Sequence, residues 1–162
     1  MKFQPFKLWF ALALLAGCGE PKHGDHAGHS RHGHQHTPPH GGTPVVLGNE
    51  DYHLEFVLDP AGGKLQAYVL DSHMDKFIRL TNESFTVSAK PNDKPETLVF
   101  RAAPNAATGE KVGDTALFEA QADWLKTVKS FEVVLDELTV RGRKFEKIAF
   151  NFPKGNAPAG GP

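Results

Sequence analysis

Apolar and polar residues alternate through most of the chain between residues 51 and 152, and this two-residue period is typical of β-strands that bury one face. Residues 51–58 show it clearly, because one face carries only apolar side chains: Tyr52, Leu54, Phe56 and Leu58. The sequence DPAGG at 59–63 is a strong turn signal, and residues 64–70 then alternate again. The pattern predicts a β-hairpin over residues 51–71.

Further short strands are predicted at residues 77–80, 85–89, 97–102, 117–120, 131–140 and 144–152. Residues 120–128 are the one helical feature, and we expect a short helical turn there with Trp124 and Leu125 facing inward. About eight or nine short strands, with almost no helix between them, favour an antiparallel arrangement over βαβ units. The sequence therefore predicts an all-β fold, an antiparallel Ig-like β-sandwich.

The folded domain is expected to cover residues 44–153, and this length is enough to bury a core without disulfides or a structural metal. A Gly/Pro/Ala-rich tail at 154–162 is expected to be disordered. Any metal site on the domain would then serve function rather than stability.

The N-terminus has the features of a secretory leader. Two lysines precede a continuous apolar run at 8–16, which is too short to span a bilayer, since that takes about 20 residues. Residues 1–17 are thus predicted to be a signal peptide.

The leader ends in Leu15-Ala16-Gly17-Cys18, which resembles the bacterial lipobox. That resemblance implies that Cys18 is lipidated, becomes the first mature residue and holds the protein at the periplasmic face of the cell envelope. Gly19 rather than Asp after the cysteine implies the outer membrane. The alternative is an ordinary signal peptide with a chance cysteine.

The charge and the cysteine content of the chain limit the kinds of partner and metal site that can be expected. The chain has 18 basic and 19 acidic residues, so nothing in its net charge favours a nucleic-acid partner. Cys18 is the only cysteine, which excludes an intrachain disulfide and a cysteine-rich metal site. The expected membrane contact is the lipid anchor alone.

Seven of the nine histidines lie within residues 23–40, here called the His tract. The tract is otherwise small or polar, so residues 18–43 are expected to form a disordered tether. Neutral imidazole suits zinc, copper and nickel, and closely spaced imidazoles can share an ion in many conformations. The tract is predicted to bind such ions with little selectivity, through His23, His26, His29, His32, His34, His36 and His40. The alternative is a hydrophilic spacer.

Three groups of potential metal ligands fall in the first part of the domain: His40, then His53 with Glu55, then Asp71 with His73. Residues two apart on a strand share a face, so His53 and Glu55 can point the same way. In the predicted hairpin, residues 53 and 71 are near neighbours across the strands. We therefore expect these five side chains to converge at one end of the sheet. The alternative is that they are ordinary surface residues. Met74 adds a soft sulfur but is expected to be a core or rim residue.

Residues 40–80 resemble small periplasmic domains associated with the adaptor proteins of heavy-metal RND efflux pumps. The resemblance rests on His40-Gly41-Gly42, Gly48, Glu55 and the strand that ends at 68–71. It implies metal handling, with efflux-pump components as partners. The chain lacks the coiled-coil hairpin and lipoyl regions of an adaptor, so the resemblance points to a stand-alone accessory protein.

No catalytic constellation stands out, and we do not expect an enzyme. The sequence predicts a periplasm-facing lipoprotein that binds or buffers copper or zinc and passes these ions to a metal efflux system. The alternative from another class is an envelope protein-interaction or structural module whose His-rich spacer has no specific metal role.

Overall fold

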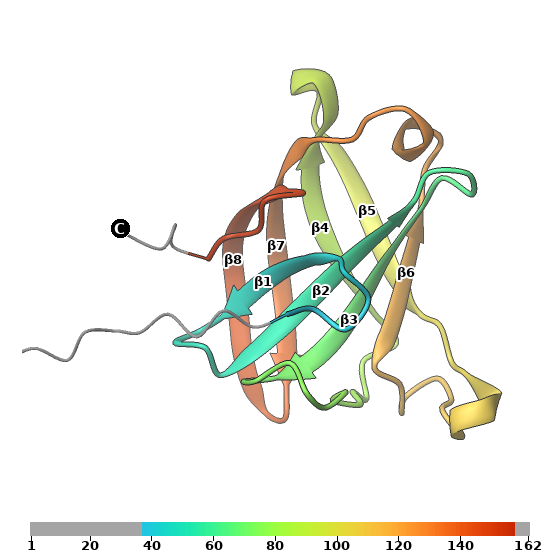
Figure 1. Cartoon of the computed structure of the whole chain (residues 1–162), viewed down its shortest axis with the longest axis vertical. Helices are drawn as coiled ribbons and strands as arrows, with labels where there is room; N and C mark the ends of the chain where they lie inside the picture. Colours follow the sequence, from blue (N-terminus) through green and yellow to red (C-terminus); the bar gives the residue numbers. More distant parts are fainter. Residues whose placement is uncertain (1–36, 158–162) are drawn as a thin grey trace, which may run out of the picture. The chain divides into compact units, whose positions relative to one another are not determined.

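The computed structural model describes residues 37–157, which form an all-β fold (Figure 1). Every strand pairing in it is antiparallel. The strands are β1 (Thr43–Leu47), β2 (Tyr52–Asp59), β3 (Lys64–Asp71), β4 (Ser84–Lys90), β5 (Glu96–Ala102), β6 (Leu117–Gln121), β7 (Phe131–Val140) and β8 (Arg143–Phe152).

The strands make one continuous hydrogen-bonded sheet, in the order β1-β2-β3-β6-β5-β4-β7-β8. This sheet curls until its two edge strands, β1 and β8, come side by side, so that it is nearly closed and barrel-like (Figure 1). The antiparallel all-β prediction is confirmed, whereas the expected Ig-like pair of sheets is replaced by this single curled sheet. Alternation along a strand shows which side chains face a core, but both arrangements bury alternate residues in the same way.

The segment after β8 bridges the remaining gap between β8 and β1. The side-chain amide of Asn156 donates to the Val46 carbonyl (3.1 Å) and accepts from the Val46 N–H (2.7 Å). The Thr43 hydroxyl donates to the carbonyl of Pro153 (3.1 Å). Residues 154–157, which the sequence assigned to a disordered tail, are therefore part of the fold.

Aromatic side chains fill the inside of the curled sheet. Phe56, Phe100 and Phe118 are fully buried. Phe56 meets Phe100 edge-on and stacks against Phe150, with ring centroids 5.6 Å and 4.9 Å away. The burial of these large apolar side chains against one another supplies most of the stabilisation of such a core.

Seven of the eight strands overlap predicted ones, and the hairpin is confirmed with Asp59 opposite Lys64. β1 was not predicted, because five residues including a proline give little periodic signal; Pro44 is tolerated because β1 is an edge strand. The predicted strand at 77–80 makes only isolated bridges. The expected helical turn is a 3-10 helix at Asp123–Lys126, which buries Leu125.

None of the helices in residues 37–157 is long and apolar enough to cross a membrane.

Candidate functional site

The N-terminal strap, defined here as residues 40–42, covers the outer face of β2 and binds Glu55. Glu55 is fully buried. Its carboxylate accepts hydrogen bonds from the backbone N–H of His40 (2.7 Å) and of Gly42 (2.9 Å). The other carboxylate oxygen lies 2.8 Å from His40 Nδ1. The last part of the expected tether is thus fixed to the domain by one acidic side chain.

Glycine at position 42 allows this close approach. A Cβ atom there would lie 2.5 Å from the carbonyl oxygen of Phe56 and 2.9 Å from Glu55 Cγ. Both distances are shorter than real Cβ contacts, and one of the atoms is backbone that cannot move aside cheaply. Gly42 therefore determines how near the strap can lie to β2.

The imidazole of His40 is also held by two aromatic rings. It stacks on Tyr68 with ring centroids 4.0 Å apart and planes inclined by 19°. Phe77 lies 5.7 Å from the His40 ring and 5.9 Å from the Tyr68 ring. Tyr68 reaches this position because the hairpin register places it directly opposite Glu55. Strap, β2 and β3 together fix the position of one imidazole.

The chemistry of this arrangement follows from the carboxylate. When the Glu55 carboxylate is ionised it can only accept, and the Nδ1 atom of His40 then carries the proton of this 2.8 Å contact. In the neutral imidazole, Nε2 then keeps its lone pair and can act as a metal ligand or as a hydrogen-bond acceptor. This is the arrangement in which carboxylates commonly orient metal-ligating histidines.

Burial raises the pKa of Tyr68 above its ordinary value, and the negative charges of Glu55 and Glu119 raise it further. Glu119 belongs to a polar row on the outer face, in which it accepts from Gln66 (2.7 Å) and pairs with Lys64 (3.0 Å). The Tyr68 hydroxyl therefore stays neutral at physiological pH, with Gln66 3.5 Å away.

The other predicted ligands lie in a second group at the end of the hairpin. His53 is buried, and its Nδ1 lies 3.2 Å from the backbone oxygen of Asp71. His53 and Asp71 are thus close, as predicted. The Asp71 carboxylate instead caps the following turn, accepting from the N–H groups of Asp75 (3.0 Å) and Lys76 (3.3 Å). These backbone hydrogen bonds outweigh the effect of desolvation and lower the Asp71 pKa, with a smaller contribution from His73.

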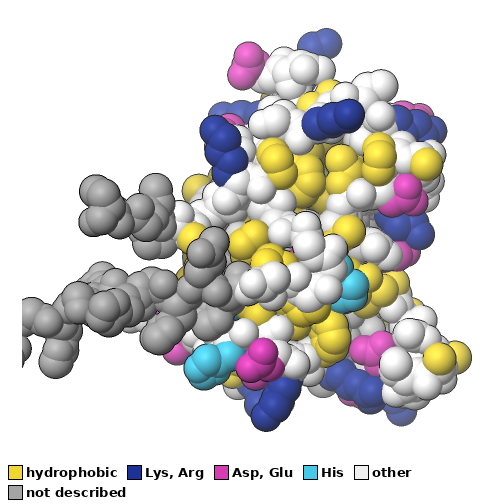
Figure 2. Space-filling model, viewed as in Figure 1, with side chains coloured by type: hydrophobic (Ala, Val, Ile, Leu, Met, Phe, Trp, Pro, Cys, Tyr) yellow, Lys and Arg dark blue, Asp and Glu magenta, His cyan; other side chains and the backbone are white. Residues whose placement is uncertain are grey.

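His73 is exposed, and its Nδ1 lies 3.0 Å from the Ser72 hydroxyl. Met74 is buried in the core, as expected for a core or rim residue. Within residues 37–157 no three His, Cys, Asp or Glu side chains lie close enough together to hold a metal ion. The structure thus pairs His40 with Glu55 and places His53 against Asp71, but it does not gather all five side chains around one point. Figure 2 likewise shows histidine side chains that lie apart from one another on the face in view.

A cavity of about 580 Å³ lies beside His40. Its lining includes the three rings of His40, Tyr68 and Phe77 and the polar residues Asn105, Thr108 and Glu110. Tyr68 and Phe77 were not singled out from the sequence as site residues. The position of Tyr68 could have been found from the sequence, because a hairpin turn centred between residues 61 and 62 places residue 68 opposite residue 55. The position of Phe77 could not, because it depends on an irregular loop.

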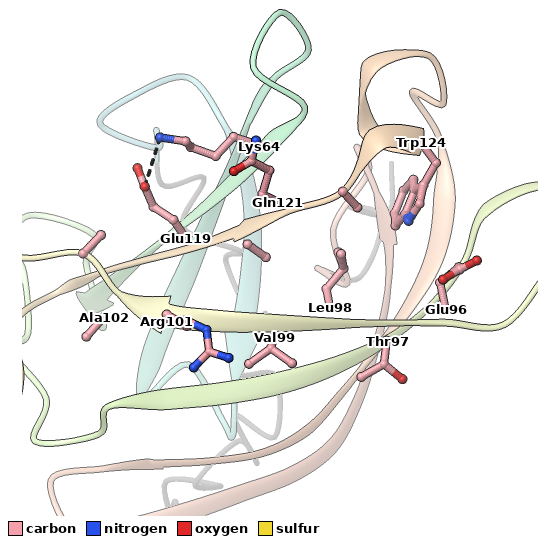
Figure 3. Close-up of a pocket in the computed structure, with 13 residues that line it drawn as sticks. Lys64, Glu96, Thr97, Leu98, Val99, Arg101, Ala102, Glu119, Gln121 and Trp124 are labelled. Carbon is pink, nitrogen blue, oxygen red and sulfur yellow. Dashed lines mark ion pairs between the residues drawn. The ribbon is translucent and has the colours of Figure 1, made fainter.

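A second cavity, of about 570 Å³, lies where β5 and β6 diverge (Figure 3). Figure 3 shows Lys64 directed toward Glu119 on one side of it and Trp124 on the other. None of the described residues that line it is a histidine or a cysteine, and it offers no metal ligand comparable to His40.

Several predicted functional residues lie outside the described part of the chain: the leader, the lipidation site Cys18 and the tract histidines His23, His26, His29, His32, His34 and His36. Their assigned roles remain predictions from the sequence. The comparisons with known proteins add no relative, because no family model, no curated protein and no solved structure matches the chain.

Proposed function

We propose that this protein is a lipoprotein, anchored through Cys18 at the periplasmic face of the envelope, that binds or buffers copper or zinc ions. In this proposal the His tract collects ions, and His40 is the tract histidine that lies in the described residues, where the fold determines its position. Transfer of the ions to a metal efflux system is the expected downstream step.

One observation supports the proposal most strongly: the fully buried Glu55 lies 2.8 Å from His40 Nδ1. A buried carboxylate that fixes the ring and tautomer of a histidine leaves its other nitrogen available as a ligand. His40 is also partly open, with 37% of its side chain exposed, so an ion can reach the ring.

The test is a calorimetric titration of the mature chain, residues 18–162, with Cu(II) and Zn(II). We expect several ions to bind. In a tract variant, in which the six histidines between positions 23 and 36 are asparagine, we expect a single weak site to remain. His40→Asn in that variant should abolish the site, and Glu55→Gln should weaken it about 10- to 100-fold, as loss of a partner behind a metal-ligating histidine typically does.

His73→Asn is the matched control, because His73 is exposed and lies outside the strap. It should leave the affinity of the remaining site unchanged. If His73→Asn lowers the affinity as much as His40→Asn does, the site lies at the turn after β3 instead. If the intact mature chain binds neither ion above the level of a histidine-poor control protein, the metal role is wrong and the interaction-module alternative gains.

Anchoring is tested separately, in cells. The full chain should incorporate labelled fatty acid and sediment with membranes, and Cys18→Ser should lose both properties. Unlabelled wild-type protein in the soluble periplasmic fraction would contradict the lipid anchor without affecting the metal proposal.

A further inference from the structure

The cavity beside His40 has two distinct groups of lining residues. One is the aromatic cluster of His40, Tyr68 and Phe77, whose ring centroids lie between 4.0 Å and 5.9 Å apart. Phe77 is 49% exposed, which is unusual for a phenylalanine in this domain. An exposed ring beside a cavity is apolar area available to a ligand.

The other group is polar and internally braced. Arg79 donates to the Thr108 carbonyl (2.6 Å) and to the Asp114 carboxylate (3.2 Å). The Thr108 hydroxyl donates to Glu110 (2.8 Å), and Glu110 in turn accepts from the Ala116 N–H (3.0 Å). These bonds fix the loop at 105–114 to the rest of the fold, so this side of the cavity is preformed.

Among the described residues that line the cavity, His40 is the one histidine and none is a cysteine. A zinc site built by protein usually has three or four ligands, and no such group is present in residues 37–157. A bare ion bound through His40 would gain nothing from the aromatic rings of Tyr68 and Phe77. The cavity, of about 580 Å³, has room for a small organic molecule beside the His40 ring.

We propose that this cavity takes a metal chelate, in which a small planar organic molecule already holds the copper or zinc ion. The inference rests on the proposed metal-binding function and specifies the form of the ligand. His40 Nε2 forms a bond to the metal and one metal–water bond breaks, so that a water molecule leaves and no electron is transferred. The organic part lies against Phe77 and Tyr68.

The test uses the tract variant of the mature chain, so that the histidines at 23–36 do not compete. Three probes are titrated into it: the 1:1 complex of Cu(II) with 1,10-phenanthroline, aqueous Cu(II), and phenanthroline without metal. We expect the complex to bind at least tenfold more tightly than either component. Its electron paramagnetic resonance spectrum should gain the coupling of one further nitrogen.

His40→Asn should remove both the tight binding and the added nitrogen coupling. Phe77→Ala should weaken the complex about tenfold while it leaves the affinity for aqueous Cu(II) unchanged. The control is Val112→Ala, which shortens another exposed apolar side chain (54% exposed) that does not line the cavity. It should alter neither value.

Two results would overturn the inference. Equal binding of metal-free phenanthroline would make the cavity a plain aromatic-ligand site, and equal binding of the complex to the His40→Asn variant would remove the metal bond. If the complex fails to bind while the intact mature chain still takes up several bare ions, the inference falls and the proposed function stands. If the intact chain binds no metal, both fall.

Discussion

The side-chain amide of Asn156 binds both the N–H and the C=O of Val46, 110 residues earlier in the chain, and so takes the place of a neighbouring strand. An edge strand normally leaves these backbone groups to solvent or to another chain. Here the edge of β1 is covered by a residue beyond the last strand. The closure of the sheet thus depends on a residue that belongs to none of the eight strands.

Asn156→Ala removes both of these hydrogen bonds. We expect it to lower the free energy of unfolding by about 1–3 kcal/mol, at roughly 1 kcal/mol for each hydrogen bond. Chemical denaturation monitored by circular dichroism measures the loss. Asn156→Asp keeps the acceptor for the Val46 N–H but places a carboxylate oxygen against the Val46 carbonyl, so it should not restore the wild-type stability. Equal stability of the wild type and both variants would show that the hydrogen bonds between Asn156 and Val46 contribute nothing.

Gly42→Ala should detach the strap from β2. The new Cβ would lie 2.5 Å from the Phe56 carbonyl oxygen, so we expect a loss of about 1–3 kcal/mol, as for other overpacked sites. In nuclear magnetic resonance spectra, the His40 ring should lose the upfield shift that comes from stacking on Tyr68.

Gly41→Asn is the matched control for that substitution. A Cβ at position 41 meets no atom within 4 Å, and asparagine tolerates the positive φ of 68° found there. The control should keep the stacked His40 signals. A similar loss of stacking in both variants would mean that general loosening of the strap, and not the contact with β2, causes the effect.

The Tyr68 pKa should lie above 10 and should depend on Glu55. The raised pKa means that the fold favours the neutral phenol, so this contribution to stability is complete below pH 10 and is lost as pH rises through the folded-state value. Tyr52→Phe leaves Tyr68 as the only tyrosine, and its ultraviolet titration gives the value directly.

Glu55→Gln in the Tyr52→Phe background should lower the Tyr68 pKa but leave it above 10, because burial is the larger cause and remains. Glu132→Gln, an exposed acidic residue on β7, is the matched control and should leave the Tyr68 pKa unchanged. An unchanged value in the Glu55 variant would show that the charge of Glu55 does not reach the phenol.

Asp71→Asn should destabilise the protein at neutral pH and less so in acid. The pKa of Asp71 is lowered, so its contribution to stability is present above the unfolded value of about 3.8 and is lost as pH falls through the folded value. The difference in unfolding free energy between wild type and variant, measured from pH 7 to pH 3, should therefore shrink on acidification. A constant difference would mean that the turn at 71–76 does not depend on the charge.

The sequence by itself determined the local structure. Period-two alternation located most of the strands, and the turn at 59–63 predicted a hairpin that brings His53 near Asp71. These features depend on interactions between residues close in sequence, and so a pattern along the chain can reveal them. The same pattern led to the confirmed prediction of an antiparallel all-β fold.

Only the tertiary structure decided how the sheet closes and which side chains meet. A single curled sheet and two packed sheets bury alternate residues equally well, and the choice depends on strand order, which long connections set. The pairing of Asn156 with Val46 and the stacking of His40 on Tyr68 and Phe77 join residues that no local pattern relates. The register decides further that Tyr68 lies opposite Glu55, since a shift of one residue would exchange the two faces of the strand.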